Sequence, residues 1–179
     1  LPPALQAVGR ATRTESTAAQ RERTAEQSTT TPVSPADAAL SGQSETALVA
    51  GGCFWCVEAD LEKTPGVLEV VSGYAGGTSE NPTYDTYGAG GHREVVEVTY
   101  DPTQITYEEI LIVTMKTTDP TDDTGTFADR GDKYSAAFYY ETDAQRQIIF
   151  DLIDEVNAYG PYQKPLAIDV EARPRFWPA

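Results

Sequence analysis

Two cysteines stand three positions apart behind a glycine pair, in the stretch GGCFWCVEAD at residues 51–60. Cys53 and Cys56 are the only cysteines among the 179 residues, so any thiol chemistry of this chain must use them. Three uses fit such a pair: ligands of a metal ion, a structural disulfide, or a reacting thiol with a second thiol to assist it.

A structural zinc site is poorly supported by the sequence. Zinc takes four ligands in such sites, and besides its two cysteines the chain offers a single histidine, His92, far along the sequence. A disulfide between residues three apart closes a very small loop and removes little chain entropy, so it would be a weak staple. We therefore expect no metal, and two interpretations of Cys56 stay open: a redox partner or a small buried side chain.

Cys53 has the position of a nucleophile. The apolar run at 47–50 predicts a short buried strand, the glycines at 51–52 turn the chain, and residues 53–63 have helical length before a Pro-Gly stop. At such a helix start, unpaired backbone N–H groups and the positive end of the helix dipole favour a thiolate. The sequence therefore predicts a reactive thiol at Cys53.

The residues between the cysteines indicate which kind of substrate would fit beside them. Phe54 and Trp55 form an aromatic wall that suits an uncharged group such as a methyl on sulfur, although an aromatic pair at a helix start is also typical of a core. A Cys-x-x-Cys pair equally suits a thioredoxin-type oxidoreductase that acts on protein disulfides. The strands and helices predicted around it are not clearly thioredoxin-like.

The elements that must position these side chains follow from the apolar periodicity. Strands are predicted at 67–75, 93–100, 134–140 and 166–172, and helices at 106–117 and 142–159. Each of these two helices opens with a capping box, Thr-x-x-Glu or Thr-x-x-Gln. The order β-α-β-β-α-β-α-β indicates an α+β sandwich with a mixed sheet and helices mainly on one face.

Glu94 is the one acidic residue whose pattern points to the chemistry of a site. In the strand at 93–100 it shares a face with Val96, Val98 and Tyr100. Desolvation on that face would keep its carboxyl protonated near neutral pH, as a proton donor requires. The pattern alone fits a solvated glutamate at a strand edge equally well.

Composition divides the chain near residue 46. Residues 1–46 are rich in Thr, Ser, Ala, Gln and Glu and hold almost no aromatic or branched apolar side chains. Such a segment can bury too little surface to offset the entropy of ordering it. We expect a disordered tail or tether over 1–46 and a catalytic domain over 47–179.

The charge and hydropathy of the chain exclude some partners. A formal net charge of −15 repels nucleic acid and anionic lipid. No stretch approaches the roughly 20 apolar residues that a membrane-spanning helix needs. The sequence starts at Leu1 without an initiator methionine, which suggests that a segment was removed. The compartment is undefined: cytoplasmic by default, or exported if that segment was a leader.

Four blocks in order resemble the type A peptide methionine sulfoxide reductases: GGCFWCVEADLEKTPGV, VVSGYAGGTSENPTY, GHREVVEVTYDP and FADRGDKYSAAFYY. The resemblance runs from about Ala47 to the C-terminus. It implies a ferredoxin-like α/β sandwich and an enzyme that returns the S epimer of methionine sulfoxide, free or in oxidised proteins, to methionine. It also implies thioredoxin or another dithiol as reductant and no organic cofactor. We further expect a monomer.

The resemblance implies a role for each matching position. Cys53 in GCFW would attack the sulfoxide sulfur, and Glu94 in GHREV would protonate the oxygen, which otherwise leaves poorly. The product would be a sulfenic acid on Cys53, which a thiol must return. Cys56 is the remaining thiol of the chain and lies one helical turn away. The resemblance implies that Phe54 and Trp55 hold the methyl of the substrate and that Tyr84 and Tyr134 hydrogen-bond the sulfoxide oxygen. Asp129 would help to organise the site through water.

Three positions depart from the family pattern. Many members have Gly at the position of Cys56 and carry recycling cysteines near a C-terminus where this chain has none. The usual Tyr-Arg-Ser block reads Tyr134-Ser135-Ala136, and Thr118 stands where a histidine is common. These changes affect substrate approach and pH behaviour rather than the class of reaction. A non-catalytic module that binds oxidised methionine is a further alternative.

Overall fold

The computed structural model describes residues 44–179 of the chain. A six-stranded sheet forms its frame, with the strand order β7-β6-β1-β3-β2-β8. Its strands are β1 (Glu45–Ala50), β2 (Val67–Ala75), β3 (Arg93–Tyr100), β6 (Ala137–Tyr140), β7 (Asp169–Ala172) and β8 (Trp177–Pro178). Outside this sheet lie a small hairpin, three helices and one 3-10 turn: β4 (Gly125–Thr126), β5 (Asp129–Arg130), α2 (Phe54–Leu61), α3 (Tyr107–Thr117), α4 (Asp143–Tyr159) and η1 (Asp132–Tyr134).

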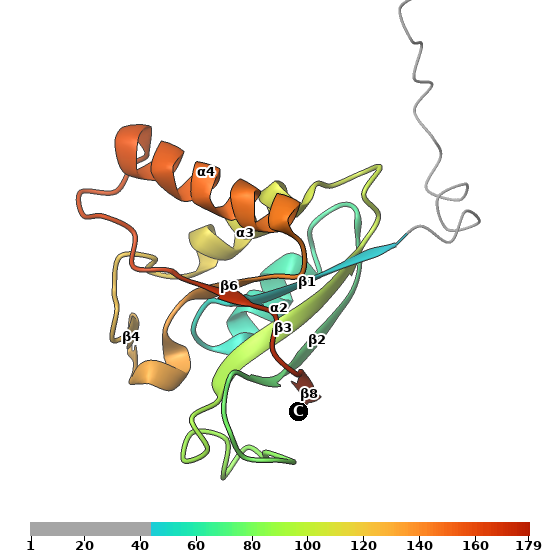
Figure 1. The fold of residues 1–179 in the computed structure, drawn as a ribbon, viewed down its shortest axis with the longest axis vertical. Coiled ribbons are helices and arrows are strands. Elements are labelled where there is room, and N and C mark those ends of the chain that lie inside the picture. Colours follow the sequence, from blue (N-terminus) through green and yellow to red (C-terminus); the bar gives the residue numbers. More distant parts are fainter. Residues whose placement is uncertain (1–43) are drawn as a thin grey trace, which may run out of the picture. The chain divides into compact units, whose positions relative to one another are not determined.

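The sheet is mixed, as predicted. β1 pairs antiparallel with β3 and with β6, and β2 pairs antiparallel with β3 and β8. β6 and β7 are parallel, and α4 runs between them in sequence. In Figure 1 the α2, α3 and α4 helices lie together along the sheet. The predicted α+β architecture is confirmed.

Alternation along the strands divides the buried side chains between two clusters. Val49 on β1 and Val96 on β3 belong to the larger cluster, which also holds apolar side chains of α2, α3 and α4. Leu48 and Val95, one position away on the same strands, belong to a smaller cluster on the other face, against which Phe176 packs. The helices therefore cover one face of the sheet, and part of the C-terminal segment covers the other.

The capping boxes predicted from the sequence form as expected. Thr106 accepts a hydrogen bond from the backbone N–H of Glu109, whose side chain accepts one from the N–H of Thr106. Thr142 and Gln145 make the same reciprocal pair at the start of α4. Each box satisfies N–H groups that have no partner within their own helix.

Several element boundaries differ from the predicted ones. The strand predicted at 134–140 begins only at Ala137, because the chain before it closes the η1 turn. The strand predicted at 166–172 begins at Asp169, because the N–H of Ala167 donates to the carbonyl of Pro120 instead of a neighbouring strand. The two-residue strands β4, β5 and β8 were not predicted, since a periodicity of two cannot show in so short a segment.

The first strand begins before the predicted domain boundary. Glu45 and Thr46, which the composition placed with the tail, are the first two residues of β1. Glu45 accepts a hydrogen bond from the hydroxyl of Tyr100 at 2.7 Å, and Thr46 accepts one from Arg173 at 3.0 Å. The prediction for residues 1–43 lies outside the described residues.

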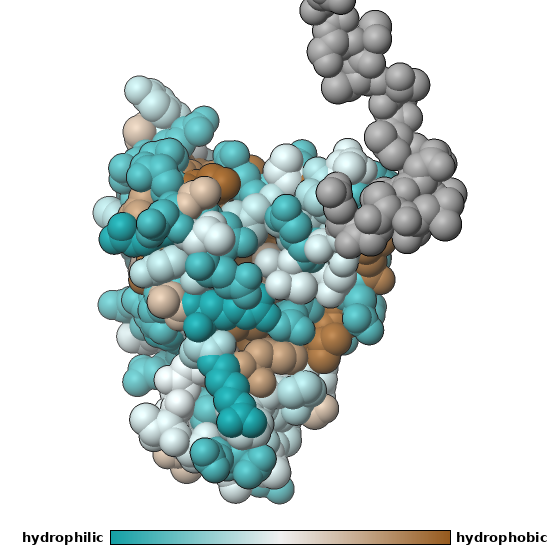
Figure 2. Space-filling view, turned by 45° about the vertical axis from the view of Figure 1, so that its right-hand side comes forward, coloured by the Kyte–Doolittle hydropathy of each residue, from teal (hydrophilic) through white to brown (hydrophobic). Residues whose placement is uncertain are grey.

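The surface of this part of the chain agrees with its acidic composition. Figure 2 shows mainly hydrophilic residues on one face, with apolar surface gathered in small separate patches. Within residues 44–179, none of the helices combines the length and the apolar character needed to cross a membrane.

Candidate active site

Cys53 is the N-cap residue of α2, directly after the tight turn that follows β1. Its carbonyl accepts hydrogen bonds from the N–H groups of Cys56 at 3.0 Å and Val57 at 3.3 Å, which start the helix. Gly52 has a φ of +90°, and a Cβ there would lie 2.0 Å from Cγ2 of Thr126. Only glycine fits this turn, because both the backbone conformation and the space exclude a side chain.

The two thiols are free and lie beside one another at the surface. Cys53 is half-buried and Cys56 is exposed. Partial burial raises the pKa of Cys56, and the charge of Cys53 and a hydrogen bond with its thiol raise it further. The interpretation of Cys56 as a small buried side chain is therefore wrong.

Glu94 lies against the start of α2, with 2% of its surface exposed. Its Oε2 accepts a hydrogen bond of 3.0 Å from the backbone N–H of Phe54, the residue after Cys53. Its Oε1 accepts one of 2.5 Å from the hydroxyl of Tyr87. The alternative of a solvated glutamate at a strand edge is excluded, and the carboxyl is bonded to the residue that follows Cys53.

An aromatic cluster adjoins Cys53. Trp55 and Tyr84 are stacked, with ring centroids 5.8 Å apart and planes inclined by 10°, and they remain 60% and 54% exposed. Phe54 is buried and lies 5.6 Å from Trp55 and 6.4 Å from Tyr84, between centroids. This cluster offers an apolar surface, open to solvent on one side, for a small uncharged group.

Tyr134 shares the Lys133 ammonium with Tyr87, the tyrosine that donates to the carboxyl. It is half-buried at the end of η1, and the Lys133 ammonium lies over both its ring and that of Tyr87, at 4.9 and 5.0 Å from the centroids. Burial raises the pKa of Tyr87 far above its usual range, and hydrogen bonds with Glu94 and Tyr134 raise it further. Glu94 and Tyr87 are therefore joined by a direct hydrogen bond, and Tyr134 is among the groups that affect the ionisation of Tyr87.

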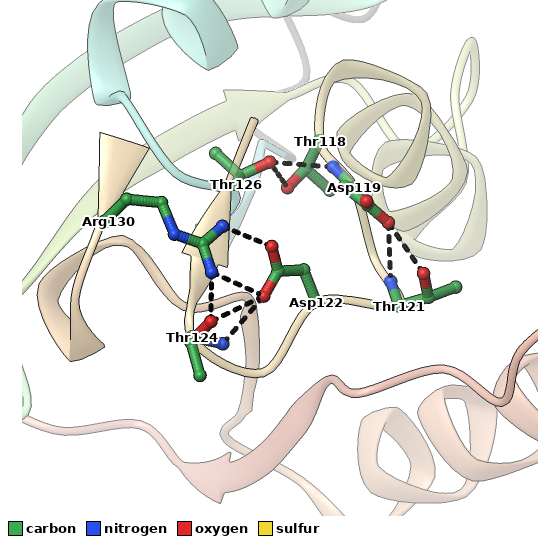
Figure 3. Close-up of polar contacts among 7 residues, drawn as sticks. All are labelled: Thr118, Asp119, Thr121, Asp122, Thr124, Thr126 and Arg130. Carbon is green, nitrogen blue, oxygen red and sulfur yellow. Dashed lines mark hydrogen bonds and ion pairs between the residues drawn. The ribbon is translucent and has the colours of Figure 1, made fainter. Parts of the chain in front are cut away.

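Asp129 reaches the site from the β4–β5 hairpin. Its charge is among the causes that raise the pKa of Cys56, which places it near that thiol. Figure 3 shows what holds the hairpin: the hydroxyls of Thr118 and Thr126 are 2.9 Å apart, and the N–H of Asp119 donates to Thr126 at 2.8 Å. Thr118 therefore has a structural function here, at a position where a histidine was noted as common.

An ion pair anchors the hairpin on its other side. Arg130 binds Asp122 and the hydroxyl of Thr124, and Asp122 also accepts from the backbone and side chain of Thr124 (Figure 3). The hydrogen bond with Arg130, followed by those with Thr124, holds the pKa of Asp122 well below its usual range. The loop that carries Asp129 is thus tied together by its own side chains.

The arginine missing from the Tyr134-Ser135-Ala136 block is replaced from another strand. Arg93 on β3 donates through Nε to the Ser135 hydroxyl at 2.9 Å. Its other nitrogens bind Glu171 at 2.7 Å and Asp169. A guanidinium therefore occupies this side of the fold although the local sequence has none.

The structure thus brings together most of the residues that the sequence singled out, and it adds one that was missed. Tyr87 was not distinguished from the other tyrosines, because its segment was predicted only as a Gly-rich loop. His92 is buried; it accepts from the N–H of Gly77 and contacts the carbonyl of Ser79, so it braces that loop. Within residues 44–179, no group of three or more His, Cys, Asp or Glu side chains is placed to hold a metal ion.

Sequence comparison gives consistent matches. The profile of the family described as peptide methionine sulfoxide reductase matches residues 45–179. Peptide methionine sulfoxide reductase MsrA 2 of Rhizobium meliloti (strain 1021) is 47% identical over 141 residues, which are 79% of this chain and 70% of the relative. The MsrA/MsrB protein of Vibrio cholerae is 45% identical over 141 residues, 78% of this chain but 37% of that longer protein.

Solved structures agree with these matches. Methionine sulfoxide reductase A of Corynebacterium diphtheriae is 30% identical with a TM-score of 0.66, covering 77% of this chain and 72% of that chain. Reduced Mxr1 from Saccharomyces cerevisiae is 23% identical with a TM-score of 0.70, covering 82% of each chain, which shows a shared fold. From the profile match and the identity with these relatives, this chain belongs to the peptide methionine sulfoxide reductase family.

Proposed function

We propose that this enzyme reduces methionine-S-sulfoxide, in proteins or as the free amino acid, to methionine, with Cys53 as nucleophile and Glu94 as proton donor. The observation that carries the proposal is the 3.0 Å hydrogen bond between Oε2 of Glu94 and the N–H of Phe54. It holds a carboxyl shielded from solvent beside the thiol at the start of α2. The two groups that sulfoxide reduction requires are thereby neighbours.

The first step transfers oxygen from the substrate to the enzyme. The Cys53 thiolate attacks the sulfoxide sulfur while Glu94 gives its proton to the oxygen. The attack forms a bond between the two sulfurs. The hydroxyl then passes to the Cys53 sulfur as the substrate's sulfur–oxygen bond and the new sulfur–sulfur bond break, so the thioether leaves as methionine and Cys53 ends as a sulfenic acid, two electrons more oxidised. A neutral carboxyl is needed because an unprotonated sulfoxide oxygen is a poor leaving group.

The surrounding side chains hold the substrate. Phe54, Trp55 and Tyr84 form the apolar surface beside Cys53 and receive the methyl group on sulfur. The hydroxyl of Tyr134, linked to Glu94 through Tyr87, lies on the side of the carboxyl and binds the sulfoxide oxygen. Asp129, held by the β4–β5 hairpin, organises this region through water.

The second step converts the sulfenic acid on Cys53 into a disulfide that a dithiol can reduce. The Cys56 thiolate attacks the sulfur of the sulfenic acid, a disulfide forms, and hydroxide leaves as water after protonation. This step is supported by the exposure of Cys56 and by its position one helical turn from Cys53, whose charge is among the causes that raise the pKa of Cys56. A bridge between residues one helical turn apart is strained and exposed, which favours its reduction by a dithiol.

The reductant is thioredoxin or another dithiol, and the enzyme acts as a monomer. A disulfide accepts two electrons, and a dithiol protein supplies both in one exchange. Mxr1 from Saccharomyces cerevisiae, a relative in fold at 21% identity and a TM-score of 0.55 over 84% of this chain and 87% of that one, has been solved in complex with Trx2. In our proposal the exposed face of α2 around Cys56 meets the reductant.

The function is tested with the two epimers of methionine sulfoxide assayed separately. Consumption of a thioredoxin-coupled reductant should occur with the S epimer and not with the R epimer, and Cys53→Ser should abolish it. Reduction of insulin disulfides at a comparable rate would instead favour a thiol-disulfide oxidoreductase. Saturable binding of the S epimer without consumption of reductant would favour a binding module.

The resolving role of Cys56 is tested by single turnover. Cys56→Ser should convert about one equivalent of sulfoxide and leave a sulfenic acid on Cys53 that a dimedone probe traps. It should then lose most turnover with thioredoxin, whereas Cys53→Ser should do neither. Normal turnover of Cys56→Ser with thioredoxin would show that an external thiol resolves Cys53.

A further inference from the structure

We propose that Tyr87 is a positioning residue for the proton donor, holding the Glu94 carboxyl in its reactive orientation through one hydrogen bond. The inference rests on the proposed role of Glu94 as acid. Tyr87 lies in the Gly-rich loop before β3, and its hydroxyl is 2.5 Å from Oε1 of Glu94. Its 2% exposure removes the hydroxyl from competition with water.

The two oxygens of Glu94 have different neighbours. Oε2 faces the backbone N–H of Phe54, a group that can only donate. The proton of the neutral acid is therefore best placed on Oε1, which faces Tyr87. A hydroxyl both donates and accepts, so Tyr87 can donate to the ionised carboxylate and accept from the neutral acid. A hydrocarbon group at this place would serve neither state.

Tyr87 is itself rigidly seated. Its ring is stacked on that of Tyr74, with centroids 4.7 Å apart and planes inclined by 20°, and the Lys133 ammonium lies over it at 5.0 Å. Its backbone N–H donates to Thr83, and its carbonyl accepts from Gly90 and His92. Ring and backbone are thus both fixed, so the hydroxyl constrains the carboxyl rather than following it.

The position of Tyr87 also links the acid to its surroundings. The hydroxyl of Tyr87 donates to Glu94, and Glu94 and Tyr134 are both among the groups that raise the pKa of Tyr87. Titratable groups approach Glu94 from four elements: Tyr74 on β2, Tyr87 in the loop, Lys133 and Tyr134 in η1, and Cys53 at the start of α2. Among these groups, Tyr87 donates directly to the carboxylate.

The test compares Tyr87→Phe with Tyr74→Phe, which removes a hydroxyl from the other ring of the same stack. In single turnover with methionine-S-sulfoxide, Tyr87→Phe should slow formation of methionine at neutral pH by about tenfold, part of the roughly 10²–10⁴-fold that a general acid contributes. The substrate concentration for half-maximal rate should stay within about threefold. Tyr74→Phe should match the wild-type enzyme in the rate of methionine formation and in the substrate concentration for half-maximal rate.

A pH profile separates positioning from a loss of packing. Without the donated hydrogen bond the ionised carboxylate is less stabilised, so the alkaline fall in the reduction rate should move to higher pH in Tyr87→Phe. Incorporation of a fluorotyrosine at residue 87, a stronger donor of nearly the same shape, should move it to lower pH. The fluorotyrosine protein also provides the test if Tyr87→Phe does not fold.

Measuring Glu94→Gln in parallel distinguishes the positioning role of Tyr87 from the proposed role of Glu94 as the acid. A slow Glu94→Gln enzyme together with a folded Tyr87→Phe enzyme of wild-type rate and pH profile would overturn the role of Tyr87 alone. A Glu94→Gln enzyme of normal rate would overturn the role of Glu94 as acid. An unchanged pH profile of the reduction rate in the fluorotyrosine protein would also contradict the positioning role of Tyr87.

Discussion

At the scale of single residues, one backbone amide links the helix that Cys53 opens to Glu94, the two residues that we propose as nucleophile and proton donor. The N–H of Phe54 belongs to the helix that Cys53 opens, and it donates to the carboxyl of Glu94 on β3. The same amide is one of the N–H groups that a helix leaves without a partner in its first turn. The helix start therefore supplies both a favourable place for a thiolate and a fixed contact for the acid.

Glu94→Gln should slow the reduction step far more than it weakens substrate binding. Glutamine keeps an acceptor for the Phe54 N–H but cannot supply a proton, and general acids contribute about 10²–10⁴-fold. Glu94→Asp should fall between glutamine and the wild type, since its carboxyl is withdrawn by one methylene. Rapid-quench measurement of methionine gives the rates, with Glu69→Gln on the exposed part of β2 as control. A change below about threefold would remove Glu94 from this role.

The resolution step should be limited by ionisation of Cys56. Its pKa is raised above the model-compound value of 9.0, first by partial burial and then by Cys53. When Cys53 is a sulfenic acid, the effect of burial remains. A raised pKa keeps the thiol neutral to higher pH, and only the thiolate attacks, so disulfide formation should accelerate steadily from pH 6 to about 9. Quenched-flow mass spectrometry after a single turnover measures the rate of disulfide formation at each pH.

A substitution of Asp129 tests whether its charge contributes to the raised pKa of Cys56. The negative charge of Asp129 is one of the causes that raise the pKa of Cys56, so Asp129→Asn should increase the rate of disulfide formation at neutral pH. Asp123→Asn, an exposed residue of the same loop, should leave it unchanged. A rate that is already level below pH 8 in the wild-type enzyme would contradict this account.

At the scale of elements, the site is built where the β4–β5 hairpin packs on the turn before α2. Thr126 of β4 contacts Gly52, and its hydroxyl is bonded to Thr118 and to the N–H of Asp119. The hairpin also carries Asp129, whose charge is among the causes that raise the pKa of Cys56. The orientation of the nucleophile depends on a contact between segments more than 70 residues apart in the chain.

Gly52→Ala should destabilise the protein and remove activity by displacing Cys53. Its methyl would lie 2.0 Å from Cγ2 of Thr126, and φ is +90°. Overpacking and backbone strain together predict a loss of about 2–5 kcal/mol in the free energy of unfolding. Gly131→Ala is the matched control, because its φ is +108° but nothing lies within 4 Å, so it should lose only about 1–3 kcal/mol. Equal losses in urea titrations would show that the contact with Thr126 is unimportant.

The parts of the site that lie within one element could be predicted, and those that depend on tertiary contacts could not. Cys53 at a helix start and Glu94 on a buried face follow from short-range pattern. Tyr87 could not be found in this way, since its role depends on a loop folding back onto β3. Arg93 reaching Ser135 is a similar case, because the two are 42 positions apart.

At the scale of the whole molecule, the elements with a strong local pattern could likewise be predicted, whereas those that depend on contacts between distant segments could not. Within residues 44–179, strong periodicity, turn signals and capping boxes were enough to predict β1, β2, β3 and the helices α2, α3 and α4. The edges of the sheet were less predictable: β8 is two residues long, and β7 is shorter than its alternating pattern. At an edge a strand has one neighbour, so the few hydrogen bonds made there by distant segments decide where pairing begins.

The start of the folded domain gives a prediction of its own. A chain that begins at Ser44 should keep the stability and activity of the full chain, because β1 starts at Glu45. A chain that begins at Ala47 should be less stable. It lacks the carboxylate that accepts from the Tyr100 hydroxyl at 2.7 Å, and Tyr100 is fully buried. A buried hydroxyl without its partner costs about 1–3 kcal/mol.

Urea unfolding of the two truncated chains and of the full chain measures these differences. Glu45→Ala in the chain that begins at Ser44 should account for most of the loss, whereas Glu45→Gln, which still offers an acceptor, should retain most of the stability. Reductase activity at 25 °C should be similar in all of them, because β1 delivers Cys53 from its other end. Equal stability of the chains beginning at Ser44 and Ala47 would place the domain boundary at residue 47 after all. A chain beginning at Ser44 that is much less stable than the full chain would show that residues 1–43 contribute to the folded domain.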